Sequence, residues 1–182
     1  MSNKYLEIII GPMYASKTSK LIEIYKKNVY CSIPTIVINH ESDTRYSDTM
    51  LSTHDKVMIP CIKTNNLFDI WKNNKMDDYS VILINEAQFF EDLVQFVNQM
   101  LDKNKKIYIF GLDGDFERKK FGQILDLIPL CDKVIKLTSL CSICKDGTPG
   151  IFSKRITSET EQTVVGSDNY IPVCRKCYNA KL

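Results

Sequence analysis

The chain has 182 residues, which suits one domain or one core with a small appendage. Hydrophobic residues make up 44% and charged residues 25%, the composition of a globular protein with a buried core. The formal net charge of +2 is too small to indicate a nucleic-acid or membrane partner. No apolar stretch is long enough for a secretory leader or a bilayer span, so we expect a cytoplasmic protein.

The first predicted strand, Leu6–Ile10, runs directly into a candidate phosphate-binding loop. The spacing Gly11-x-x-x-x-Ser16-Lys17-Thr18 is that of the P-loop, with serine where the pattern has glycine. Such a loop wraps backbone N–H groups around phosphates at the positive end of the following helix. Lys17 would reach the outer phosphates, and Thr18 would offer its hydroxyl to Mg²⁺.

Ser16 leaves two alternatives open. If the position is left-handed, serine costs about 1–2 kcal/mol relative to glycine. If it is helical, the cost is small and the hydroxyl could donate to a phosphate. A strand, turn and helix without any nucleotide is the competing interpretation of the whole segment.

Apolar runs of strand length alternate with helical patterns along the first three quarters of the chain. This alternation predicts an α/β fold with a mostly parallel sheet covered by helices, over residues 1–139. Residues 140–182 contain two cysteine pairs and more turn formers, and they predict a small second lobe. The expected strands are Leu6–Ile10, Thr35–Asn39, Lys56–Cys61, Val81–Asn85, Ile107–Leu112 and Lys133–Leu137. The expected helices are Lys17–Tyr30, Leu67–Lys72, Asp92–Leu101 and Phe121–Leu127.

Polar residues follow several of these strands, at the sheet edge where ligands of α/β folds gather. Glu86 comes directly after the fourth strand, where it could take a proton from a substrate hydroxyl, or merely cap a helix. Asn85 stands where P-loop enzymes normally place an aspartate serving Mg²⁺. Arg45, after the second strand, could stabilise phosphoryl charge or belong to a surface ion pair.

Four of the seven cysteines form two C-x-x-C pairs, Cys141/Cys144 and Cys174/Cys177. Two pairs at this spacing predict a tetrahedral structural zinc site, with redox dithiols or coincidence as the alternatives. The remaining cysteines lack such partners, and we expect them to be small buried hydrophobes: Cys31, Cys61 and Cys131.

Taken in order, these motifs resemble the type II thymidine kinase family over about residues 7–178. The resemblance rests on 11–18 (GPMYASKT), 43–47 (DTRYS), 53–55 (THD), 85–90 (NEAQFF), 111–116 (GLDGDF), 119–122 (KKFG), the first cysteine pair, and Tyr170 before 174–178 (CRKCY). It implies a RecA-like P-loop core and a zinc-binding lobe whose lasso loop closes over the nucleoside. It also implies transfer of the γ-phosphate of ATP to the 5′-hydroxyl of thymidine, giving dTMP.

The resemblance assigns roles residue by residue. Glu86 matches the general base, with Lys17 and Arg45 as further catalytic groups, and Thr18 matches the magnesium ligand. Residues matching the ATP site are Gly11, Pro12, Met13, Tyr14, Ala15, Ser16, Lys17, Thr18, Asp43, Thr44, Arg45, Asn85, Glu86, Ala87 and Gln88. Residues matching the thymidine site are Met13, Phe89, Leu112, Phe116, Phe121, Gln162, Thr163, Val164, Val165, Gly166 and Tyr170, with Arg155 supporting the lasso. Simple core packing is the alternative for Phe90 and Phe121.

The resemblance further implies a homotetramer, with dTTP as a possible feedback inhibitor. Ser16 and Asn85 depart from the family pattern, and we expect a working kinase whose weakened metal site is partly compensated by Asp43 or Asp113. One alternative is a catalytically weakened or inactive homologue that binds nucleosides. Another is a RecA-like ATPase with a zinc ribbon acting on nucleic acid, although lysine and arginine are interleaved with acidic residues here.

Overall fold

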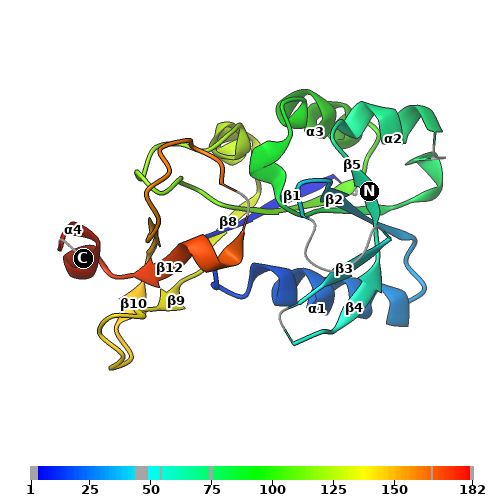
Figure 1. Ribbon diagram of the computed structural model, residues 1–182. Coiled ribbons are helices and arrows are strands. Elements are labelled where there is room, and N and C mark those ends of the chain that lie inside the picture. Colours follow the sequence, from blue (N-terminus) through cyan, green and yellow to red (C-terminus); the bar gives the residue numbers. More distant parts are fainter. Residues whose placement is uncertain (1–3, 44–48, 54, 74–75, 165, 181–182) are drawn as a thin grey trace.

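The computed structural model describes residues 4–43, 49–53, 55–73, 76–164 and 166–180. A six-stranded sheet with strand order β5-β2-β6-β7-β1-β8 forms its centre, and all of its strand pairings are parallel (Figure 1). The strands are β1 (Tyr5–Ile10), β2 (Thr35–His40), β5 (Ile62–Thr64), β6 (Val81–Ile84), β7 (Lys106–Gly111) and β8 (Lys133–Lys136). The four central strands are nearly continuous apolar runs because both faces of the sheet are covered.

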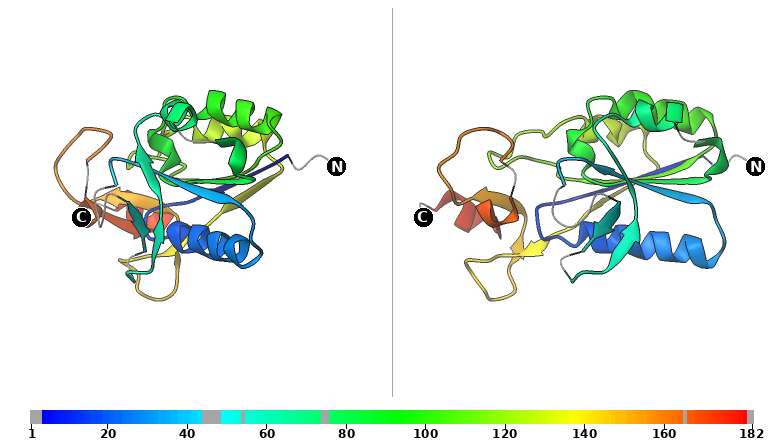
Figure 2. Two further views of the ribbon diagram at one scale, coloured as in Figure 1. Left: turned by 90° about the vertical axis from the view of Figure 1, so that its right-hand side faces the viewer. Right: turned by 45° about the vertical axis from the view of Figure 1, so that its right-hand side comes forward.

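Helices lie on both faces of this sheet (Figures 1 and 2). Helix α1 (Lys17–Tyr30) packs Leu21 and Ile22 onto one face, in a core that includes Ile9, Val37 and Phe110. The other face carries α2 (Leu67–Asn73), α3 (Leu93–Asp102) and the short 3₁₀ helices η1 (Met76–Asp78) and η2 (Ala87–Phe89). This layered α/β arrangement confirms the predicted fold class.

One predicted strand is placed differently by the structure. Residues Met58–Pro60 (β4) do form a strand, but they pair antiparallel with β3 (Met50–Ser52) in a hairpin outside the main sheet. The edge of the main sheet is instead Ile62–Thr64, which follows Cys61 directly. The prediction of Lys56–Cys61 as a strand of the parallel sheet is therefore wrong, because each strand here is only three residues long and too short for a clear pattern.

Two further predictions need correction. The predicted helix Phe121–Leu127 is a 3₁₀ helix, η3 (Ile124–Leu130), because Gly122 has a left-handed φ of 59° and Pro129 lies inside the segment. Cys31 is exposed, because it immediately follows the last turn of α1, so its prediction as a buried residue is wrong. Cys61 and Cys131 are partly buried and pack against the two cores.

After β8 the chain leaves the main sheet and forms small paired strands, seen at the yellow-to-red end of Figure 1. Strands β9 (Ser139–Leu140) and β10 (Pro149–Gly150) pair antiparallel, as do β11 (Phe152–Arg155) and β12 (Tyr170–Val173). The 3₁₀ helix η4 (Ser167–Asn169) precedes β12, and α4 (Arg175–Asn179) follows it. The domain boundary near Ser139 stays a prediction. None of the helices in the described part of the chain has the length and apolar character that a bilayer crossing requires.

Candidate active site and metal centre

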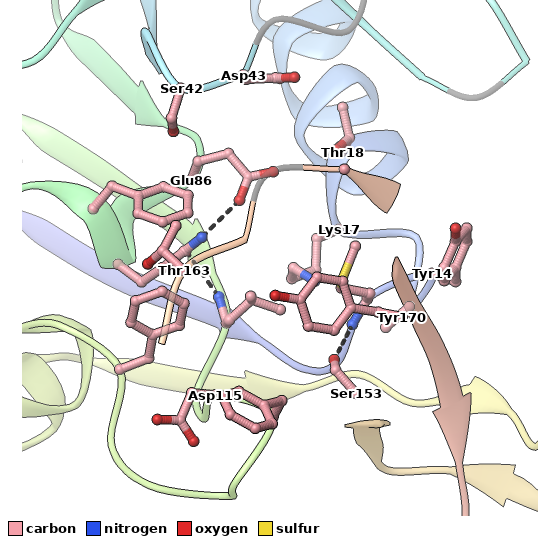
Figure 3. Close-up of a pocket in the computed structure, with 18 of the residues that line it drawn as sticks. Tyr14, Lys17, Thr18, Ser42, Asp43, Glu86, Asp115, Ser153, Thr163 and Tyr170 are labelled. Atoms are coloured by element: carbon pink, nitrogen blue, oxygen red, sulfur yellow. Dashed lines mark hydrogen bonds between the residues drawn. The ribbon is translucent and has the colours of Figure 1, made fainter. Parts of the chain in front are cut away.

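A cavity of about 620 Å³ lies at the carboxyl ends of the central strands. The loops that follow β1, β2, β6 and β7 all contribute to it, and so does the segment between β11 and β12. In the view of Figure 3, Asp43 and Glu86 lie toward the same end of the cavity as Thr18, whereas Asp115 lies toward the other end. The volume falls in the range of small-molecule sites.

The backbone at Ser16 and at Gly11 constrains the turn of the phosphate loop. Ser16 has φ 58° and ψ 25°, so the left-handed alternative holds and the serine carries a strained backbone at the start of α1. Gly11 has φ 150°, and a Cβ at this position would collide with the Leu137 carbonyl oxygen. Lys17 Nζ donates to the carbonyl oxygens of Gly11 (3.1 Å) and Pro12 (2.7 Å). Two backbone carbonyl groups of the loop therefore hold the Lys17 ammonium in place.

Glu86 is held at the carboxyl end of β6 by a buried amide. Gln88, 3% exposed, donates from Nε2 to Glu86 Oε2 (2.8 Å), while its Oε1 accepts from the backbone N–H of Leu112 (3.0 Å). Glu86 itself has a left-handed φ of 51°, a conformation that persists only where surrounding contacts enforce it. Glu86 lines the cavity. Gln88 thus fixes one carboxylate oxygen and ties the loop after β6 to the loop after β7.

Asn85 takes part in a chain of amides that ends at a carboxylate. Its side-chain N–H group donates to Asn39 Oδ1 (3.0 Å), and Asn39 Nδ2 donates to Asp43 Oδ2 (3.0 Å). Both asparagines are almost fully buried, whereas Asp43 lines the cavity. Lys63 Nζ also donates to the Asp43 carbonyl oxygen (2.6 Å). Asn85 itself carries no charge, so this chain of hydrogen bonds ends on the negative charge of Asp43.

His40, the last residue of β2, packs its ring against two phenylalanines. The ring centroids lie 5.3 Å from Phe89 and 4.8 Å from Phe90. Its Nδ1 accepts from the backbone N–H of Ser42 (3.1 Å), which orients the loop after β2. Desolvation lowers the pKa of His40, against the opposing effect of the carboxylates of Glu41 and Glu86. The His40 ring supports the wall formed by Phe89.

Aromatic side chains form the part of the cavity near the β7 loop. Phe89 and Phe121 meet edge to face at 5.4 Å, and both line the cavity, whereas Phe90 is a core residue. Phe116 also lines the cavity, and the guanidinium of Arg155 lies 3.7 Å from its ring centroid. Flat rings of this kind suit a planar ligand whose polar groups lie at its edge.

Most residues predicted for the site line this one cavity. Those are Met13, Tyr14, Ala15, Ser16, Lys17, Thr18, Asp43, Glu86, Gln88, Phe89, Leu112, Phe116, Phe121, Gln162, Thr163, Val164, Gly166 and Tyr170. Gly11, Pro12, Asn85 and Ala87 are not among the lining residues. Asp113, considered above as a compensating acid, pairs with Lys136 and does not line the cavity either. Thr44, Arg45 and Val165 lie outside the described residues.

Other lining residues were not predicted as site residues. Ser153 in β11 accepts from the backbone N–H of Met13 (2.9 Å), which joins β11 to the phosphate loop. No sequence signal marks it, because the contact spans 140 positions. Asp55 and Asp115 belong to motifs noted above, so a signal existed for them. The further unpredicted lining residues are Ser19, Ser42, Ser52, Thr53, Gly114 and Asp168.

The four predicted cysteine ligands converge at one point, and we call them the four-cysteine cluster: Cys141, Cys144, Cys174 and Cys177. Their Sγ atoms all lie within 4.8 Å of one another. Cys144 Sγ lies 3.8 Å from Cys174 Sγ and 3.4 Å from Cys177 Sγ, close to the roughly 3.8 Å between sulfurs of a tetrahedral zinc thiolate site. Desolvation opposes ionisation of Cys141, but N–H donors, led by Cys144 and Cys174, outweigh it and lower its pKa to about 6. The convergence of four sulfur atoms at this spacing fits a metal ion.

Comparisons with known proteins agree with these observations. The family model described as thymidine kinase matches residues 4–178. Proteins named thymidine kinase from vaccinia virus (strain Western Reserve), variola virus and monkeypox virus are each 39% identical to this chain over 180 residues. Each alignment covers 98% of this chain and 98% of the viral protein.

Proposed function

This chain belongs to the thymidine kinase family, and on that premise we propose that it transfers the γ-phosphoryl group of ATP to the 5′-hydroxyl of thymidine in this cavity. The observation that carries the proposal is that a phosphate loop, a positioned carboxylate and an aromatic pocket line one space. Phosphoryl transfer depends on positioning and on stabilisation of phosphate charge, and each of these parts supplies one requirement.

The phosphate loop binds the triphosphate of ATP. Its backbone N–H groups and the N-terminus of α1 face the phosphates, and Lys17 moves from its carbonyl partners to the outer phosphate oxygens. The Thr18 hydroxyl and the Asp43 carboxylate would hold Mg²⁺, since both line the cavity and both offer hard oxygen ligands. A bound Mg²⁺ would neutralise charge on the phosphate oxygens. Arg45 remains a predicted further stabiliser of that charge.

Glu86 is the proposed general base. It accepts the proton of the 5′-hydroxyl as the oxygen attacks the γ-phosphorus, and ADP leaves. The hydrogen bond from Gln88 occupies one carboxylate oxygen, so that the other is oriented toward the substrate. Gln88 therefore acts as a positioning residue rather than as a contact of ATP.

The aromatic pocket holds the thymine base. Phe116 and Phe89 provide flat walls, and Met13, Leu112 and Phe121 fill the space around them. Backbone groups of Gln162 to Gly166 read the polar edge of the base, and the lasso excludes water that would compete for the γ-phosphate. Zinc in the four-cysteine cluster would fix the lobe that carries this lasso, and its role is structural.

A nucleoside panel tests the proposal. Purified protein with ATP and Mg²⁺ should phosphorylate thymidine, and deoxyuridine and deoxycytidine should be poorer substrates. Replacing Glu86 by Gln should lower kcat by about 10²–10⁴ and leave thymidine binding largely unchanged. The matched control is Glu91→Gln, at an exposed glutamate outside the cavity. Retained turnover in the Glu86 variant would assign the base to another group, and no turnover in the wild type would favour the inactive-homologue alternative.

We further propose, from family membership alone, a homotetramer in the cytoplasm that is inhibited by dTTP. Analytical ultracentrifugation tests the assembly, and a titration of dTTP into the thymidine assay tests the inhibition. A monomer in the first experiment, or unchanged rates in the second, would contradict these two expectations separately.

A further inference from the structure

The lasso, defined here as residues 156–169, is closed at its base by the strands on either side. Arg155 and Tyr170 face each other in the β11–β12 register, and Ile156 donates its N–H to the Asn169 carbonyl oxygen (3.0 Å). The Tyr170 hydroxyl also donates to the Val164 carbonyl oxygen (3.3 Å). These contacts fix where the lasso begins and ends. They do not connect its outer part to the core across the cavity.

A side-chain contact makes that connection. Gln162 Nε2 donates to Asp115 Oδ2 (2.8 Å), and both residues line the cavity. Asp115 is only 6% exposed, and its other oxygen accepts from the backbone N–H groups of Glu117 and Lys119, each at 2.9 Å. The β7 loop thus presents an oriented carboxylate oxygen, and Gln162 reaches it from the lasso.

The same lasso residue is held a second time through its backbone. Arg155 Nη2 donates to the Gln162 carbonyl oxygen (3.2 Å), while Nη1 donates to the carbonyl oxygens of Glu159 and Glu161. The guanidinium also lies over Phe116, the residue next to Asp115. Gln162 is therefore fixed at its carbonyl and at its side chain, and the two anchors flank the aromatic wall of the pocket.

We propose that Asp115 and Gln162 form a latch that holds the lasso closed over the bound nucleoside. Both act as positioning residues: they set where Thr163 and Val164 stand relative to Phe116. A neutral amide on a carboxylate forms a directional bond that can break and re-form, as entry and release of a substrate require. This inference rests on the proposed function, because it assigns the enclosed ligand to the nucleoside.

The latch predicts a particular kinetic signature. It acts on retention of the nucleoside rather than on the reacting oxygen, so its loss should raise KM and leave kcat nearly unchanged. Replacing Gln162 by Glu keeps the side-chain length but sets two carboxylates against each other. We expect the KM for thymidine to rise about 10-fold or more, the size that loss of one hydrogen bond to a charged acceptor gives. Thermolysin should also cut the lasso of the free protein faster.

A second substitution should restore the contact. In the Asp115→Asn, Gln162→Glu double variant, the amide N–H introduced on the β7 loop donates to the carboxylate introduced on the lasso. The amide carbonyl at position 115 still accepts from the turn. We expect KM and the cleavage rate to return to within about 2-fold of the wild type. The matched control is Thr160→Glu, which adds the same charge to an exposed position of the lasso, and both quantities should stay at wild-type values.

The outcomes separate the latch from the proposed function. Equal KM and equal cleavage in Gln162→Glu and Thr160→Glu would overturn the latch. A fall in kcat with unchanged KM would also overturn it, by placing Gln162 in the chemical step. If the wild type fails to phosphorylate thymidine, the proposed function falls, while faster cleavage of Gln162→Glu and its reversal in the double variant would still support the latch.

Discussion

The left-handed backbone at Ser16 predicts that glycine at this position stabilises the protein. Ser16 has φ 58°, and its side chain makes no hydrogen bond that caps the helix and could offset the strain. A residue with a Cβ in this conformation costs about 1–2 kcal/mol. Glycine also gains freedom in the unfolded chain, which removes about 0.5–1 kcal/mol of that benefit. The net gain for Ser16→Gly is therefore about 1 kcal/mol, or about 2–4 °C in Tm for a chain of this size.

Ser16→Ala is the matched comparison, because it removes the hydroxyl but keeps the strained Cβ. Urea unfolding of both variants and of the wild type measures the difference. Ser16→Gly should exceed Ser16→Ala by about 1 kcal/mol. The KM for ATP tests the hydroxyl separately: if it donates to a phosphate, both variants should show the same increase. Equal stabilities of the glycine and alanine variants would refute the strain at Ser16.

Further predictions concern the hydrogen-bonded chain from Asn85 to Asp43, the four-cysteine cluster and the thiol of Cys61. Asn85→Asp should lower the free energy of unfolding, measured with urea, by about 1–3 kcal/mol, because the new carboxylate oxygen faces the Asn39 Oδ1 acceptor. Adding Asp43→Asn lets all of the hydrogen bonds in the chain run in the opposite direction, so the double variant should recover most of the loss. An unchanged stability of the single variant would contradict the observed chain of hydrogen bonds. If the four-cysteine cluster holds a structural zinc ion, as proposed, a chelator should lower Tm by more than about 5 °C, and added zinc should restore it. An unchanged Tm would argue against a structural metal. Desolvation raises the pKa of Cys61 to about 11, so its thiolate is scarce at about pH 8. Iodoacetamide should therefore label the exposed Cys31 much faster than Cys61, which peptide mass spectrometry can measure. Equal labelling rates of the two thiols would contradict this prediction.

The sequence predicts this fold well where structure is local. The bounds of α1 match its predicted range, because the phosphate loop sets its start and the apolar stripe sets its length. The central strands are predictable because burial on both faces makes them continuous apolar runs. The β3–β4 hairpin and the edge strand β5 escaped prediction, since three residues carry no periodicity.

The candidate site residues were likewise predictable from the sequence only where they belong to a local motif. Lys17 and Glu86 stand in motifs with fixed spacing, and the structure brings both into one cavity. Ser153 could not be found, because its contact with the phosphate loop joins segments that only the fold brings together. The left-handed geometry at Ser16 decides between two alternatives that the sequence alone left open. The partnership of Asp115 with Gln162 likewise depends on how the lasso crosses the cavity.

The two carbonyl oxygens that accept from Lys17 have a consequence for the order of events at the phosphate loop. The dipoles of the Gly11 and Pro12 carbonyl groups offset part of the charge of the Lys17 ammonium, so the turn is already curved with no anion bound. Binding of a nucleotide phosphate, as proposed above, would then exchange one set of oxygen partners of Lys17 for another without refolding of the loop.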